Sequence, residues 1–128
     1  MPPAKIPGNE ADRDRPRRQF CPRGEPDPCA QSFAAVAAEL AGCPTALVSI
    51  VQDDRQWFMG ATGLDVFETP RDYAFCAHAI LASEPLVVPD AREDPRFLDN
   101  PLVTGDLGIR FYAGFPLRTS DDVAVGTL

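Results

Sequence analysis

The chain has 128 residues and a formal net charge of −7, and 45% of its residues are hydrophobic. This length allows one domain with its own core. No apolar run approaches the ~20 residues of a membrane span, and the N-terminus has no apolar signal segment, so neither membrane insertion nor secretion is expected. We predict a cytoplasmic protein.

The charge is unevenly distributed. Residues 1–28 hold six basic and five acidic residues, a net +1, so residues 29–128 carry −8 (−7 minus +1). An acidic body repels phosphate backbones and anionic lipid, so nucleic acid and membrane surfaces are poor partners. Residues 1–26 contain six of the fourteen prolines and few large apolar residues. Such a segment predicts a disordered Pro/Arg-rich tail or linker, followed by one domain over residues 27–128.

The first expected ordered element is a helix. Asp27 is a suitable N-cap, Pro28 fits the first helical position, and Gly42 fits the exit. An apolar stripe with helical spacing runs along it and consists of Phe33, Val36, Ala37 and Leu40.

Strands and one further helix are expected after it. Apolar residues on both faces of residues 45–52 indicate a central strand, with residues 55–61 as its hairpin partner. Thr69 and Pro70 resemble a capped helix start, and that helix is predicted to reach about Ser83. The remaining segments are a short strand (86–89), an irregular stretch (90–107), a strand (109–118), a turn (119–122) and a last strand (123–128). The strand pattern is unfinished at Leu128, so we expect the last strand to be incomplete.

Among possible catalytic groups, Cys76 and His78 are the nearest to a pair. In a helix, residues two apart point roughly 200° away from each other, so neither a Cys–His catalytic dyad nor a metal site is expected there. None of the four cysteines forms a C-x-x-C pair, and all are interpreted as thiols of a reducing cytoplasm. No nucleotide-binding or hydrolase motif is present. The chain is therefore predicted not to be an enzyme.

Asp90 and Arg110 can each be interpreted as structural residues or as ligand-binding residues. Asp90 lies in a proline-broken stretch where loop caps and local Asp–Arg pairs are common. Arg110 and Tyr112 are predicted on one face of a strand. An arginine among apolar residues needs a partner, so Arg110 either anchors the loop through Asp90 or Asp99 or meets an anionic ligand group.

An ordered series of motifs then identifies a resemblance. The main ones are Asp54-Arg55-Gln56-Trp57-Phe58, Phe75-Cys76-Ala77-His78-Ala79-Ile80, Asp94-Pro95-Arg96-Phe97 and Ile109-Arg110-Phe111-Tyr112-Ala113-Gly114. From residue 46 to 128 the chain resembles a GAF domain, of the subgroup found beside bacterial histidine kinases and diguanylate cyclases. The resemblance implies an α+β fold, an α/β sandwich with a central antiparallel sheet flanked by helices, and a C-terminal helix that this chain lacks.

The resemblance also implies a function. A GAF module of this kind would be a sensory or regulatory domain of two-component or cyclic di-GMP signalling. It would bind a small molecule, form a homodimer or act on an output domain. The implied pocket residues are Cys76, His78, Asp90, Arg110 and Tyr112. No cofactor is identified, and covalent bilin is not expected because Cys76 and His78 are not adjacent.

Two alternatives remain from the same resemblance. One is a thiol-dependent reductase of free methionine sulfoxide, which needs a reactive Cys76 and a resolving thiol such as Cys43 or Cys29. The other is a purely structural dimerisation domain with a degenerate pocket, associating through its helices.

Overall fold

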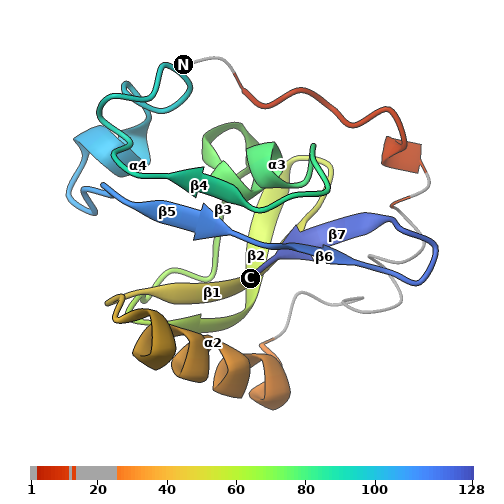
Figure 1. Cartoon of the computed structure of the whole chain (residues 1–128), viewed down its shortest axis with the longest axis horizontal. Coiled ribbons are helices and arrows are strands. Elements are labelled where there is room, and N and C mark those ends of the chain that lie inside the picture. The colour runs from red at the N-terminus through yellow and green to blue at the C-terminus, as the bar shows by residue number, and fades with distance from the viewer. Residues whose placement is uncertain (1–2, 12, 14–25) are drawn as a thin grey trace.

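The computed structural model describes residues 3–11, 13 and 26–128. The elements of residues 26–128, in chain order, are α2 (Pro28–Ala41), β1 (Ala46–Val51), β2 (Arg55–Thr62), β3 (Glu68–Pro70), the 3-10 turn η1 (Arg71–Tyr73), α3 (Phe75–Ala79), β4 (Leu86–Val88), α4 (Pro101–Thr104), β5 (Tyr112–Gly114), β6 (Pro116–Arg118) and β7 (Ala124–Thr127). Figure 1 shows a sheet with α2 on one side and with α3, β4 and β5 on the other. The predicted α+β architecture is confirmed.

An antiparallel five-stranded sheet forms the centre, in the order β3-β2-β1-β7-β6. β1 pairs with β2 as the predicted hairpin, and a bulge shifts the register after Val48. β1 also pairs with β7, at Ser49–Thr127 and Ile50–Gly126. β1 therefore lies between two strands and is covered on both faces, which explains why its apolar residues do not alternate.

α2 begins and ends at the predicted residues. The Asp27 carboxylate accepts from the amide of Ala30 at 2.8 Å, and Gly42 has a left-handed φ of 65°, which glycine adopts without strain. The face that packs on the sheet differs from the predicted stripe, however. It consists of Ala30, Ala34 and Ala38, spaced four residues apart. Phe33, Val36 and Leu40 are exposed instead, because the helix approaches the sheet too closely for large side chains.

The predicted helix from Thr69 is much shorter in the structure. Thr69 pairs with Gln56 as part of β3, and its hydroxyl accepts a hydrogen bond from the Gln56 amide at 2.9 Å instead of capping a helix. A 3-10 turn follows, and α3 begins only at Phe75 and ends at Ala79. Pairing with the sheet edge outweighs the local helix-start signal here.

The predicted strand over residues 109–118 is divided. Its central part forms β5, which pairs with β4 in a separate two-stranded sheet, and its end forms β6 at the edge of the main sheet. Phe115 lies between them and exchanges backbone hydrogen bonds with Leu128. Residues 90–107 are irregular as predicted, apart from the short helix α4, which Asn100 caps.

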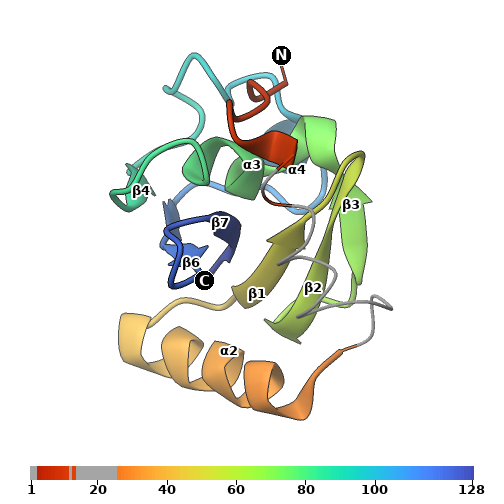
Figure 2. The same ribbon diagram turned by 90° about the vertical axis from the view of Figure 1, so that its right-hand side faces the viewer.

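The start of the chain lies beside α3 (Figure 2). Ala4 packs against the buried cluster that contains Ala77 and Ile80, and the Arg13 side chain is fully buried. The expectation of a disordered tail over residues 1–26 as a whole stays a prediction, since it falls partly outside the described residues. Among the described helices, none has the length and apolar character needed to cross a membrane.

Candidate functional site

α3 holds Cys76 in the interior, facing β5. The Cys76 side chain is buried, and the Tyr112 hydroxyl donates to its Sγ at 3.4 Å. Burial, and then the neighbouring Cys76 thiol, raise the pKa of Tyr112 above its usual value. Tyr112 is therefore a neutral hydrogen-bond donor at physiological pH. The structure thus brings together two of the five predicted pocket residues, which contact each other directly.

Four rings fill the space between α3, β5 and residues 90–107, where the resemblance implied a pocket. Phe75 and Phe97 stack with their centroids 4.1 Å apart and their planes 9° apart. Tyr112 packs on Phe75 at 5.0 Å, and His78 meets the edge of Phe97 at 4.8 Å. The edge-to-face contact of His78 with Phe97 is of a favourable kind. The series Tyr112–Phe75–Phe97–His78 is called the aromatic row below.

His78 lies at the outer end of the aromatic row. It is half-buried, and no residue in the part of the chain that the structure describes bonds to its Nε2. Burial lowers the pKa of His78, and the nearby charge of Arg96 lowers it further, while Asp94 acts in the opposite direction. Cys76 contacts Tyr112, whereas His78 contacts Phe97.

Asp90 and Arg110 lie at the surface and make local contacts. Arg92 binds both carboxylate oxygens of Asp90, at 3.0 and 2.7 Å. These hydrogen bonds are the main cause that lowers the pKa of Asp90 to about 2. Arg110 donates to the carbonyls of Val103 and Ile109, at 3.0 and 3.1 Å, so it anchors the loop through backbone oxygens. Its charge also helps to lower the pKa of Asp90, and an anchor through Asp99 stays a prediction.

The residues that build this region were only partly apparent from the sequence. Phe97 is fully buried although it lies in a stretch rich in Asp, Pro and Arg that suggests a surface loop. The available signals were the apolar pair Phe97–Leu98 amid polar neighbours and the place of Phe97 in the motif Asp94-Pro95-Arg96-Phe97. The sequence could not show that this residue would stack on Phe75, 22 positions earlier.

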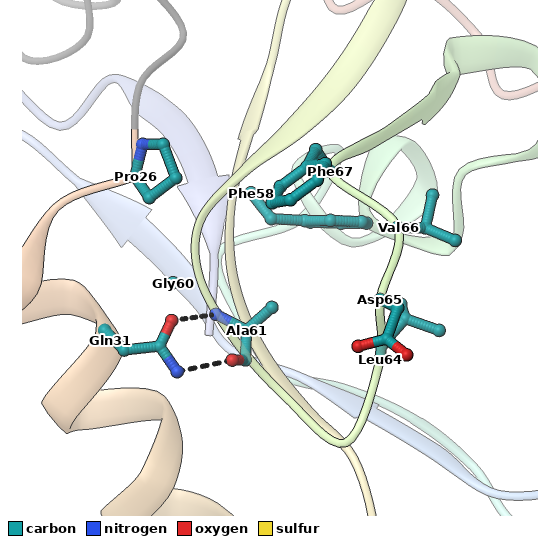
Figure 3. A pocket seen from close by; sticks show the side chains of 9 residues that line it. All are labelled: Pro26, Gln31, Phe58, Gly60, Ala61, Leu64, Asp65, Val66 and Phe67. Atoms are coloured by element: carbon teal, nitrogen blue, oxygen red, sulfur yellow. Dashed lines mark hydrogen bonds between the residues drawn. The ribbon is translucent and has the colours of Figure 1, made fainter.

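A shallow hollow lies elsewhere, where α2 meets the connection between β2 and β3. Its volume is about 180 Å³, and Figure 3 shows Phe58, Leu64 and Phe67 among its lining residues. Gln31 reaches across and pairs through its side-chain amide with both backbone groups of Ala61. The hollow is smaller than the roughly 300–1,000 Å³ usual for ligand sites, and its amide group is already hydrogen-bonded.

An apolar stripe along the outer side of α2, the α2 stripe, consists of Phe33, Val36 and Leu40. Their side chains are 59%, 54% and 84% exposed. The thiol of Cys29 is also exposed, and its spacing of four residues before Phe33 continues the same line along the helix. Glu39 is the only charged residue of α2.

The described thiols do not form a cluster. Cys76 lies on α3, on one side of the sheet, while Cys29 lies on α2 and Cys43 just after it, on the other side (Figure 1). Cys21 lies outside the described residues. Within the described ranges, no group of three or more His, Cys, Asp or Glu side chains is arranged to hold a metal ion.

Comparison with known proteins gives one family. The GAF domain model matches residues 25–128. A cyclic di-GMP phosphodiesterase of Pseudomonas aeruginosa is 47% identical over 98 residues, which is 77% of this chain and 17% of that protein. The chain thus spans about a sixth of the length of this relative.

Two solved structures share the fold. A chain described as a GAF sensor protein from Burkholderia vietnamiensis superimposes with a TM-score of 0.60 at 19% identity, over 91% of this chain and 73% of that one. The free methionine-R-sulfoxide reductase of Neisseria meningitidis gives 0.56 at 21% identity, over 77% and 57%. The match of the family model over most of the chain and the identity to the Pseudomonas protein lead to one conclusion: the chain belongs to the GAF domain family.

Proposed function

We propose that this chain is a non-catalytic regulatory GAF module of cyclic di-GMP signalling, and that it self-associates through the α2 stripe. The signalling context is supported by the identity to the Pseudomonas phosphodiesterase. The exposure of the α2 stripe is the single observation that carries self-association. Three large apolar side chains on one helix face, with no covering element among the described residues, are typical of a protein-interaction surface.

Charge favours a second copy as the occupant of this surface. The body carries a strong negative charge, so most of its faces repel an identical body. α2 carries a single charge, at Glu39, and is therefore a face on which two copies can meet with little repulsion. The row from Cys29 through Phe33 and Val36 to Leu40 advances by four, three and four residues, the spacing with which two helices pack against each other.

The expected dimer is weak. One helix face lies at or below the ~1,200 Å² that marks the lower end of specific interfaces, so association is expected to depend on concentration. Such a module would act by pairing the parts attached to it, because tethering two copies raises their effective concentration.

Light scattering over a concentration series tests this proposal. The chain has a mass of 13.9 kDa, and we expect the measured mass to rise towards twice this value with concentration. The rise should persist at high salt, because apolar contacts are not screened. A mass that stays at 13.9 kDa at every concentration contradicts self-association, and a rise that vanishes at high salt contradicts its apolar origin.

Ligand binding is the other function that the resemblance implies. The aromatic row fills the expected site, so a ligand there would have to displace Phe97 or Tyr112. A thermal-shift titration with cyclic di-GMP, linear dinucleotide and a purine nucleotide checks this. We expect no saturable increase in Tm, and a saturable increase that Phe97→Trp abolishes would favour a ligand-sensing module instead.

A thiol-dependent reductase is less favoured. Such chemistry needs a second thiol within reach of Cys76, and the two other described cysteines lie across the sheet from it. We expect no turnover of free methionine sulfoxide with a dithiol reductant. Turnover that Cys76→Ser removes would establish the enzyme.

A further inference from the structure

An arginine from the start of the chain joins two strands of the main sheet. Arg13 donates from Nε to the carbonyl of Ala124 at 2.6 Å and from Nη2 to the carbonyl of Val51 at 2.9 Å. Val51 is the last residue of β1 and Ala124 the first residue of β7. The backbone pairing of these strands includes Ile50 and Gly126. Arg13 therefore joins β1 and β7 just past this pair, through its side chain.

Glu10 connects this arginine to the start of η1, just before α3. One carboxylate oxygen accepts from Arg13 Nη1 at 2.7 Å, and the other accepts from Arg71 Nη1 at 2.7 Å. Arg71 also donates to the carbonyl of Gln52 at 2.8 Å. Glu10 therefore holds two arginines together, one from the beginning of the chain and one from the turn that leads into α3. Without it, two buried cations would face each other.

The contacts of this segment are mostly polar. Among residues 3–11 and 13, Ala4 packs on the buried cluster beneath α3, whereas Ile6 is largely exposed. Little apolar area therefore offsets the entropy lost when the segment is ordered. An attachment of this kind opens more easily than the sheet it is attached to, because local opening requires only its own contacts to break.

We propose that residues 3–11 and 13 form a releasable clasp, in which Glu10 and Arg13 bind η1, the turn that leads into α3, to the ends of β1 and β7. In the closed state, Ala4 of the clasp packs on the cluster that includes Ala77, Ile80 and Ala124. In the open state, Ala4 leaves that apolar surface, and η1 is no longer tied to β1 and β7 through Glu10 and Arg13. The clasp couples the position of residues 3–11 to that of η1 and so to α3, the helix that carries Cys76. This inference does not depend on self-association through α2, which lies on the opposite side of the sheet (Figure 2).

Hydrogen exchange of the full chain, followed by mass spectrometry, tests the clasp. In the variant Glu10→Gln, we expect exchange in residues 71–80 and 122–128 to rise by about tenfold, because Arg13 and Arg71 are buried and lose the partly exposed carboxylate that pairs with both. Exchange in α2 should be unchanged. Arg13→Lys should give a smaller rise in the same segments, because lysine keeps the charge but loses the planar fork.

Glu68→Gln is the matched control. It removes the same kind of carboxylate from an exposed ion pair with Arg55, and no change is expected at residues 71–80 or 122–128. If Glu10→Gln leaves these two segments at the wild-type rate, the clasp is not what ties them. If exchange rises equally in every segment, α2 included, the residues belong to the common core and no separate clasp exists. Labelling of Cys76 by a thiol reagent gives a second readout, which should become faster in Glu10→Gln and stay at the wild-type rate in Glu68→Gln.

Discussion

The Cα of Gly60 lies directly against the backbone of Ala30: a Cβ at position 60 would approach the carbonyl carbon and oxygen of Ala30 to 2.4 Å. This contact sets the distance between α2 and the sheet. At so short a distance only small side chains fit between them, and these are Ala30, Ala34 and Ala38. The same contact therefore accounts for the outward position of the α2 stripe.

Gly60→Ala should destabilise the fold. The methyl group meets backbone atoms that cannot move alone, so we expect a loss of roughly 1–3 kcal/mol, the usual cost of overpacking. The free energy of unfolding in urea measures this loss. Gly8→Ala is the matched control, since a Cβ there has no neighbour within 4 Å. Equal stability of the two variants would mean that α2 is not in close contact with β2.

Phe97→Ala should remove the centre of the aromatic row. Phe97 is fully buried between Phe75 and His78, and truncating a buried phenylalanine commonly costs about 3–5 kcal/mol. Phe67→Ala makes the same chemical change at a ring that is 72% exposed and should cost under about 1 kcal/mol. Urea unfolding compares them. A small effect of Phe97→Ala would indicate an open site in place of a packed one.

His78 should make stability depend on pH just below neutrality. Burial lowers the pKa of His78 from its ordinary value of 6.5, so the folded state favours the neutral ring. Below pH 6.5 the unfolded chain binds the proton more readily, and stability therefore falls as the pH drops from 6.5 through the lowered pKa. His78 is the only histidine, so in His78→Gln the unfolding free energy should lose this slope. A slope that persists in the variant would assign the effect to another group.

Glu10 should make the stability of the clasp depend on pH in a second, more acidic range. Burial would raise the pKa of its carboxyl, but hydrogen bonds and charge from Arg71 and Arg13 outweigh burial and lower the pKa from 4.5 to about 2. The stabilising effect of the ionised carboxylate is present above pH 4.5 and is lost as the pH falls towards 2. Protection factors of residues 122–128, which compare each exchange rate with the intrinsic rate at the same pH, should accordingly fall in this range in the wild type. In Glu10→Gln they should already be low at neutral pH.

Local signals in the sequence identify much of the fold. Asp27, Pro28 and Gly42 fix both ends of α2, since caps act through neighbouring backbone groups. The apolar residues on both faces of β1 predict a central strand. The motif series identifies the family. In contrast, Thr69 looks like a helix cap but joins β3, because pairing with β2 is a long-range interaction that no local pattern reveals.

The candidate site is harder to predict from the sequence than the fold. The resemblance points to Cys76 and Tyr112, which do meet in the interior. It also points to Asp90, which instead pairs with Arg92 at the surface. The burial of Arg13 depends on the carbonyls of β1 and β7, which lie far away along the chain. An arginine in a proline-rich segment gives no sign of such partners.

A comparison of two neighbouring substitutions in α2 tests self-association most directly. Val36 lies on the α2 stripe, while Ala35 is exposed on the same helix but points away from the stripe. In sedimentation velocity we expect Val36→Glu to remain monomeric at concentrations where the wild type and Ala35→Glu form dimers, because both variants add the same charge and only one places it in the interface. Equal association of Val36→Glu and the wild type would contradict a dimer formed through α2.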